Sequence, residues 1–124
     1  MKQLINNWML AVTALVLFII LFPIGMLYSI YKTINKSTSI AEGISKTLFN
    51  LALGIDQLGN SYCYLLFNDI FIKDNTIHSF GNPDETISSV LGKNKLINNL
   101  STIGKLLDKI LDIIDSNHTI KSIE

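Results

Sequence analysis

An uncharged apolar segment of 24 residues, Trp8–Tyr31, is the feature that most constrains this chain. As a helix rising about 1.5 Å per residue, it would be about 36 Å long, enough to cross a hydrocarbon core of roughly 30 Å. Because lipid offers no partner to a main-chain N–H, a helix is the conformation expected of a single segment there. Pro23 and Gly25 predict a kink in its second half. The segment therefore predicts one N-terminal transmembrane helix.

Both ends of this segment carry residues that favour the boundary between lipid and water. Trp8 lies at one end, and Tyr28 and Tyr31 lie at the other, directly before Lys32. Aromatic rings with one polar edge prefer the headgroup region, and a lysine can extend its amine to the phosphates. A cleaved signal peptide is the competing interpretation, but no small-residue cleavage site follows the apolar run. A buried helix of a soluble protein is the other alternative.

The distribution of lysines predicts the orientation of the anchor. Only Lys2 and the α-amino group precede the span. The span is followed by Lys32, Lys36 and Lys46, with Glu42 as the acidic residue among them. Since positive charge is retained on the cytoplasmic side, we expect the C-terminal domain in the cytoplasm.

Composition limits the chemistry that the rest of the chain can carry. Ten basic and ten acidic residues among 124 give a net charge of zero, which argues against nucleic acid as a partner. The single cysteine, Cys63, excludes an internal disulfide, and two histidines, His78 and His118, are too few for a His-rich metal site. The common hydrolase, metalloprotease and nucleotide-binding motifs are absent from the sequence. We expect a protein that is not an enzyme and has no cofactor.

The segment after the anchor predicts an amphipathic helix. A polar break at residues 35–39 precedes it and offers a serine or threonine as N-cap, with Glu42 near the third helical position. Apolar residues then recur in steps of three and four, as on one face of a helix. They are Ile40, Ile44, Leu48, Leu51, Ile55, Leu58, Tyr62 and Leu65.

A second membrane span across Leu48–Leu66 is the alternative for this helix. It would place Asp56, Gln57 and Asn60 in lipid. An aspartate near the centre of a membrane helix costs about 2.5–3.5 kcal/mol on insertion scales. We therefore favour an amphipathic helix that packs on its own domain or lies at the bilayer surface.

The helical period is lost over Phe67–Phe80, which predicts an irregular connection over residues 67–82. Residues 82–85 (NPDE) then indicate a helix start. Asparagine is a good N-cap, proline fits the first turn, and acidic residues favour the positive end of the helix dipole. We expect a short helix over Pro83–Leu91 that ends at Gly92.

A second apolar stripe predicts a C-terminal amphipathic helix over residues 96–114. Charged residues, including Asp108 and Asp112, lie on the side opposite the stripe. The stripe is a candidate surface for a cytoplasmic protein or for a second copy of the chain. Its members are Leu96, Leu100, Ile103, Leu107, Ile110 and Ile114.

Polar residues of the domain are candidates for a structural contact between two segments. Asp56 lies beside the apolar stripe, and a partly buried carboxylate needs hydrogen-bond donors. Ser88, Ser89 or Lys93 can supply them. A serine–lysine nucleophile is the less favoured interpretation, because helix capping and a polar helix face already explain these residues. The residues assigned to this structural polar tie are Asp56, Gln57, Asn60, Asp84, Glu85, Thr86, Ser88, Ser89 and Lys93.

Two strings, Leu53–Asn60 (LGIDQLGN) and Gly81–Lys93 (GNPDETISSVLGK), carry a resemblance to a family of short proteins of tailed phages and bacterial prophages. That family has the pattern A-L-D-Q-x-x-N, then G-D/N-P-D-E-T-I/L-S-S-R-x-G-K, then an amphipathic helix that ends near a histidine. The chain departs from it at Val90, where many members have arginine, and at Thr119, where many have cysteine. The resemblance implies a phage context and a small membrane-associated protein. It does not imply a particular reaction.

The sequence thus predicts an all-α protein in which a flank of residues 1–7 precedes a membrane helix over residues 8–31. A small helical domain, with an amphipathic helix, a short capped helix and a C-terminal amphipathic helix, follows over residues 32–124. The expected partner is the lipid bilayer of the bacterial host inner membrane, and the expected role is a lysis accessory or superinfection exclusion. The alternative is a membrane-tethered adaptor that binds a cytoplasmic protein through residues 96–114.

Overall fold

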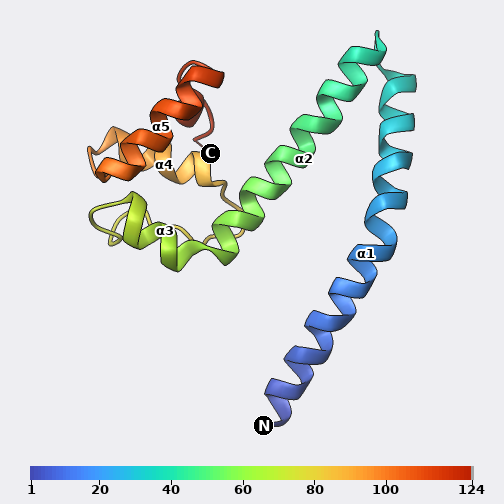
Figure 1. The fold of residues 1–124 in the computed structure, drawn as a ribbon, viewed down its shortest axis with the longest axis horizontal. Coiled ribbons are helices and arrows are strands. Elements are labelled where there is room, and N and C mark those ends of the chain that lie inside the picture. Colours follow the sequence, from blue (N-terminus) through green and yellow to red (C-terminus); the bar gives the residue numbers. More distant parts are fainter. Residues whose placement is uncertain (124) are drawn as a thin grey trace. The chain divides into compact units, whose positions relative to one another are not determined.

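The structure is a computed structural model that describes residues 1–123. Over these residues it contains six helices and no strand, so the predicted all-α class is confirmed. One isolated antiparallel bridge joins Ile72 to Leu100. The chain divides into two compact units, Met1–Asn50 and a second one that begins at Leu51. Figure 1 shows the order of the helices along the chain.

Helix α1, Lys2–Lys36, makes up most of the first unit, and none of its residues is buried. Within the described chain it is the one helix long and apolar enough to cross a membrane. The helix is longer at both ends than the predicted span of residues 8–31. Pro23 lies inside α1, and Figure 1 shows a bend partway along the helix, as the predicted kink requires.

Helix α2, Ile40–Tyr62, begins directly after the predicted polar break. Ser39 is its N-cap, because the Ser39 hydroxyl accepts a hydrogen bond from the Glu42 N–H at 3.1 Å. Hydrogen bonds from Lys46 and Thr38 lower the pKa of Glu42 to about 2. The predicted capping of this helix is therefore confirmed.

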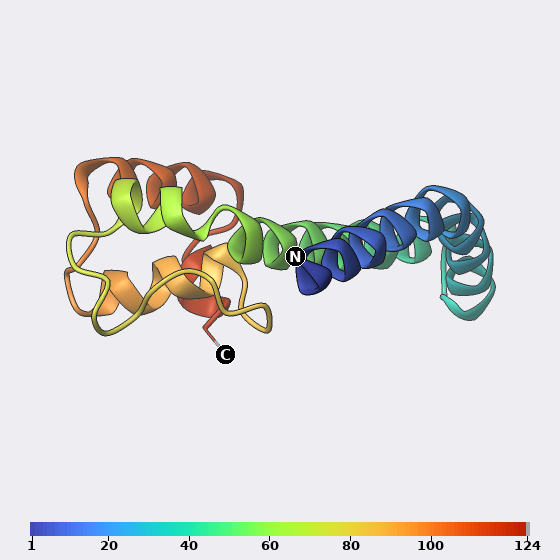
Figure 2. The ribbon, with the colours of Figure 1, turned by 90° about the horizontal axis from the view of Figure 1, so that it is seen from below.

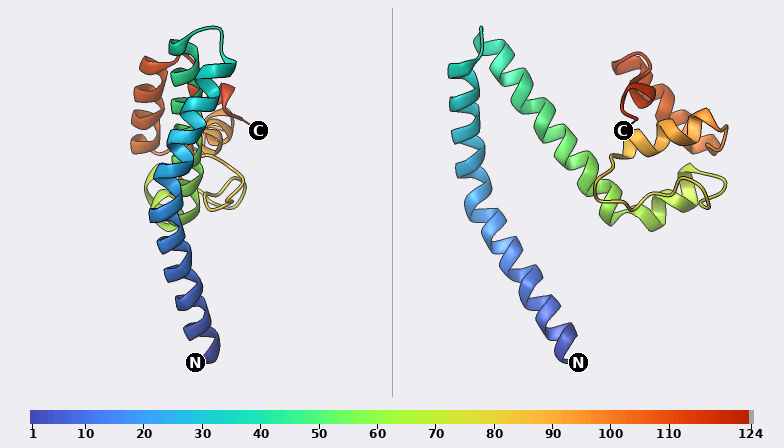
Figure 3. Two further views of the ribbon diagram at one scale, coloured as in Figure 1. Left: turned by 90° about the vertical axis from the view of Figure 1, so that its right-hand side faces the viewer. Right: turned by 180° about the vertical axis from the view of Figure 1, so that it is seen from behind.

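The second unit contains four further helices around a small core: α3, Tyr64–Phe71; α4, Ile87–Leu96; α5, Thr102–Ile114; and α6, His118–Lys121. Figures 2 and 3 show α3 and α5 in one layer and α4, α6 and the loop 73–86 in the other. The buried hydrophobic residues of the core between them are Ile72, Phe80, Val90, Leu91 and Leu100.

The predicted irregular connection over residues 67–82 is wrong at its start, because α3 continues to Phe71. Phe67 and Phe71 lie one turn apart and pack on Phe80, with ring centroids 5.6 and 6.0 Å away. These aromatic contacts stabilise a helix of only two turns, which is too short to show a helical period in the sequence. The irregular connection is the loop 73–86.

The predicted short helix is also displaced. Residues 82–85 form a turn, in which the Asn82 side chain accepts from the Asp84 N–H at 3.1 Å and the Asn82 carbonyl accepts from the Glu85 N–H at 3.1 Å. Thr86 is the N-cap instead, since its hydroxyl accepts from the Ser89 N–H at 2.9 Å. Asparagine favours turns as well as caps, so the side chain stabilises the turn and the helix starts after it.

Helix α4 does not end at Gly92 but continues to Leu96. The glycine is required by packing, because a Cβ atom at Gly92 would lie 2.1 Å from the carbonyl oxygen of Thr119. Gly92 therefore allows the main chain of α6 to approach α4 closely.

The predicted helix over residues 96–114 is shorter in the structure, because α4 ends at Leu96 and α5 begins only at Thr102. Asn98, with a φ of 54°, turns the chain after α4, and Leu100 is buried in the core beside the bridge to Ile72. Ser101 then caps α5 by accepting from the Gly104 N–H at 3.0 Å. Leu96 and Leu100 thus lie outside the helix that carries the rest of the stripe, because a good N-cap interrupts the apolar period.

We predict that Gly92→Ala destabilises the second unit by about 1–3 kcal/mol, because the added methyl group forces α6 away from α4. Urea unfolding of the full chain in detergent, followed by circular dichroism, measures this loss. Gly54→Ala is the matched control, since a Cβ at Gly54 meets nothing within 4 Å and alanine favours the helix interior. Equal stability of the two variants would contradict the close approach.

Candidate functional site

The carboxylate of Asp56 lies at the N-terminus of α4. Its Oδ1 accepts from the Ile87 N–H at 3.0 Å, and its Oδ2 accepts from the Ser88 hydroxyl at 2.8 Å. The first N–H groups of a helix have no partner within the helix, and a negative charge there is favourable. The expected contact between Asp56 and Ser88 is therefore present, and it caps α4 from α2.

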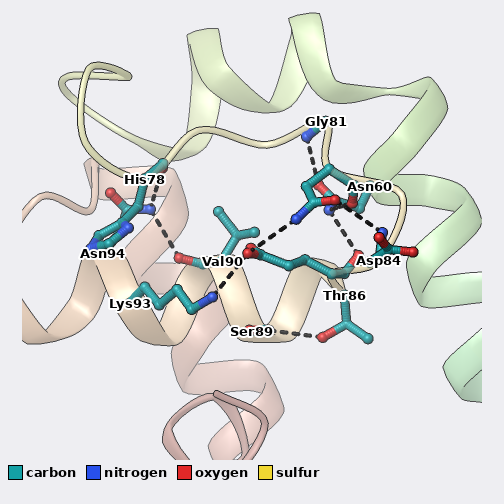
Figure 4. Close-up of polar contacts among 11 residues, drawn as sticks. Asn60, His78, Gly81, Asp84, Thr86, Ser89, Val90, Lys93 and Asn94 are labelled. Carbon is teal, nitrogen blue, oxygen red and sulfur yellow. Dashed lines mark hydrogen bonds and ion pairs between the residues drawn. The ribbon is translucent and has the colours of Figure 1, made fainter. Parts of the chain in front are cut away.

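Asn60, one turn further along α2, is completely buried and holds the turn that precedes α4. Its Nδ2 donates to the carbonyls of Asn82 and Glu85, both at 2.8 Å. Its Oδ1 accepts from the N–H of Gly81 at 3.0 Å, and Figure 4 shows these three contacts around one amide. Gly81 has a φ of 122°, a conformation that favours glycine.

Two further asparagines each pair with both main-chain groups of a single loop residue. Asn68 of α3 accepts from the N–H of Phe80 at 2.8 Å and donates to its carbonyl at 3.3 Å. Asn99 accepts from the N–H of Asp74 at 3.1 Å and donates to its carbonyl at 2.5 Å. Each amide thus offers one donor and one acceptor to one residue of the loop, as a paired strand would.

Asn94 joins the middle of the loop to α4. It is completely buried, and its Nδ2 donates to the carbonyls of His78 at 2.8 Å and Val90 at 2.9 Å, as Figure 4 shows. Asn68, Asn94 and Asn99 are not among the residues that the sequence predicts for this contact.

The remaining residues of the predicted polar tie have other partners. The Lys93 amine lies 3.0 Å from Glu85 rather than near Asp56. Ser89 is buried, and its N–H donates to the Thr86 cap. Gln57 contributes its main-chain carbonyl, which accepts from the Ser61 hydroxyl, and Asp84 is exposed on the turn.

A second polar cluster joins α4, α5 and α6. The Lys95 amine lies 2.9 Å from Asp108 and 3.2 Å from Asp112, and the Thr119 hydroxyl donates to Asp108 at 2.6 Å. The hydrogen bond to Asp108 raises the pKa of Lys95, although partial burial opposes it. Asp108 and Asp112 lie one helical turn apart, which was the available sequence signal. His118 lies outside this cluster, at 3.3 Å from Asp115.

The apolar residues of the predicted surfaces are mostly exposed. In the part of α2 that belongs to the second unit, Ile55, Leu58 and Tyr62 are exposed, and the contacts with the rest of the unit include those of Asp56 and Asn60. Among the described residues, buried polar or charged residues outnumber buried hydrophobic ones by seven to five, which indicates an interior held by polar contacts. The exposed apolar side chains therefore remain available for contact outside the chain.

The predicted boundary residues of the anchor are also exposed: Trp8, Tyr28 and Tyr31. The Lys32 amine lies 5.7 Å from the centre of the Tyr28 ring, as in a cation–π contact. Among residues 1–123, no group of three or more histidine, cysteine, aspartate or glutamate side chains could hold a metal ion.

No protein-family model, curated protein or solved structure matches this chain.

We predict that Asp56→Ala lowers the free energy of unfolding by about 1.5–3 kcal/mol, because it removes a charged acceptor from the α4 N-terminus. Chemical denaturation of the full chain in detergent measures the change. Asp84→Ala is the matched control, since the Asp84 side chain is exposed and should change stability by at most about 0.5 kcal/mol. A loss in the control as large as that in Asp56→Ala would contradict the capping role.

We predict a stability loss at high pH that depends on Lys95. Its folded-state pKa is raised above the ordinary 10.5, so the pairing stabilises fully below that value and is lost as the pH rises through the folded pKa. Lys95→Met should be less stable than the parent chain at neutral pH. Its stability should also change less with pH across the alkaline range. Parallel curves from thermal unfolding of the two proteins would contradict this contribution.

Proposed function

We propose that this chain is a single-pass membrane protein of phage or prophage type that acts at the host inner membrane and is not an enzyme. The observation that carries the proposal is α1, a helix with no buried residue that is long and apolar enough to cross a bilayer. Its exposed apolar surface needs a non-aqueous environment. The lysines after the span favour a C-terminal domain in the cytoplasm.

The phage context rests on the resemblance of two segments, Leu53–Asn60 and Gly81–Lys93. These are the segments that meet in the second unit, through the contacts of Asp56 and Asn60 with Gly81 and Ser88. These contacts support the proposal, since a fold of this kind needs those side chains together.

The non-enzymatic role is supported by the use of the polar residues. Asp56 caps a helix, Asn60 holds a turn, and Lys93 pairs with Glu85. Each has a structural role, so we assign the protein an accessory action on the envelope, in lysis or in superinfection exclusion. The second candidate is a tethered adaptor, which is favoured by the exposed apolar residues of α5, such as Ile103 and Ile110.

We predict that Val16→Lys/Ile19→Lys releases the chain from membranes. Each lysine near the centre of the span costs about 2.5–3.5 kcal/mol on insertion scales. Alkaline carbonate extraction of cell membranes, with immunodetection of the unprocessed chain, measures the retained fraction. Asn6→Lys/Asn7→Lys is the matched control, since these residues precede the apolar run. Recovery of the parent chain in the soluble fraction would contradict the anchor.

Controlled expression in a bacterial host separates the two roles. Loss of membrane potential supports the envelope-acting role. An undisturbed potential, together with co-purification of one cytoplasmic protein that Ile110→Asp abolishes, supports the adaptor instead.

A further inference from the structure

Helix α5 separates its charges between its two sides. Asp108 is buried, and both it and Asp112 face Lys95 of α4. Lys105 and Lys109 are exposed, and neither forms an ion pair with a described residue. The two acidic side chains of α5 therefore share the Lys95 amine on the inward side, and the exposed charges of the helix are those of Lys105 and Lys109.

An apolar row lies on the outward side of the same helix. Ile103, Leu106, Ile110 and Ile113 recur in steps of three and four and are between 47% and 84% exposed. The inward side is different, because Gly104 lies against the main chain of Phe71 and would clash with it if it carried a Cβ. The row thus faces away from the core of its unit.

We infer that this outward face of α5 inserts into the headgroup region of an anionic bilayer. An exposed apolar row beside unpaired lysines is the pattern of a helix that lies in the plane of a membrane surface. The apolar row alone would also suit a protein partner, whereas the exposed amines of Lys105 and Lys109 beside it match the charge of anionic lipid. The inference rests on the proposed function, since the anchor holds the unit near the bilayer.

The membrane anchor makes even a weak contact between α5 and the bilayer surface effective. A unit already held at the bilayer does not have to find it from solution, so its local concentration there is high. Each lysine near an anionic surface should favour the docked state by roughly five-fold. Docking should therefore depend on anionic lipid and on Lys105 and Lys109.

Tryptophan fluorescence of the full chain in vesicles tests this inference. Trp8→Phe/Ile110→Trp places the single tryptophan in the apolar row. Nitroxide-labelled lipids then quench it if the row enters the bilayer. The vesicles contain phosphatidylcholine, either alone or with phosphatidylglycerol. Trp8→Phe/Ile77→Trp is the matched control, because Ile77 is also exposed but lies in the loop 73–86.

The inference expects quenching at position 110 in anionic vesicles, and less quenching at position 77. Lys105→Gln/Lys109→Gln in the Ile110→Trp chain should lower the ratio of docked to undocked chain by roughly 25-fold, with unchanged circular dichroism. No quenching at position 110, while Trp8 of the parent chain is quenched, would overturn the inference and leave the anchor intact. If the tryptophan at position 110 is not quenched by the labelled lipids and its fluorescence changes with protein concentration, the inference is overturned in favour of contact with a second copy. Absence of quenching at Trp8 would overturn the proposed function itself.

Discussion

The second unit depends on the pairing of main-chain groups in an irregular loop. The loop 73–86 has no strand or helix to satisfy its N–H and carbonyl groups, and a buried group left unpaired costs about 1–3 kcal/mol. Side-chain amides supply the missing partners, because Asn68 pairs with Phe80 and Asn60 binds Gly81 and the turn that follows it. Asp56 completes the arrangement by capping α4 where the loop ends. The helices are thus joined through hydrogen bonds as much as through the small apolar core.

An interior built in this way leaves apolar surface on the outside. The part of α2 that belongs to the second unit contacts it through Asp56 and Asn60 and exposes its apolar residues, and α1 buries none of its residues. A soluble domain normally buries its apolar residues and exposes its polar ones. Large exposed apolar patches therefore mark interaction sites. Helix α5 extends the pattern, because its aspartates face Lys95 while its lysines and isoleucines are exposed. Polar contacts inside and apolar surface outside are the arrangement that the proposed membrane location requires.

Sequence reasoning succeeds where the signal is local. The long apolar run predicts α1, and a serine or threonine cap at residues 37–39 with Glu42 predicts the start of α2. It fails where two local signals compete or where the partner is distant. Asn82 is as good a turn residue as a cap, so the start of α4 is placed too early. The carbonyls that Asn60 binds lie 22 and 25 residues further along the chain, a pairing that only the fold reveals.

Hydrogen exchange of the full chain in bilayers tests the central claim most directly. The N–H groups of Phe80, Gly81 and Ile87 lie outside or at the very start of a helix but donate to the side chains of Asn68, Asn60 and Asp56. If these side chains hold the loop, the three N–H groups should be protected from exchange about as well as those in the interior of α4. Exchange as fast as that of the exposed residue Ile77 would show that the side chains do not hold the loop.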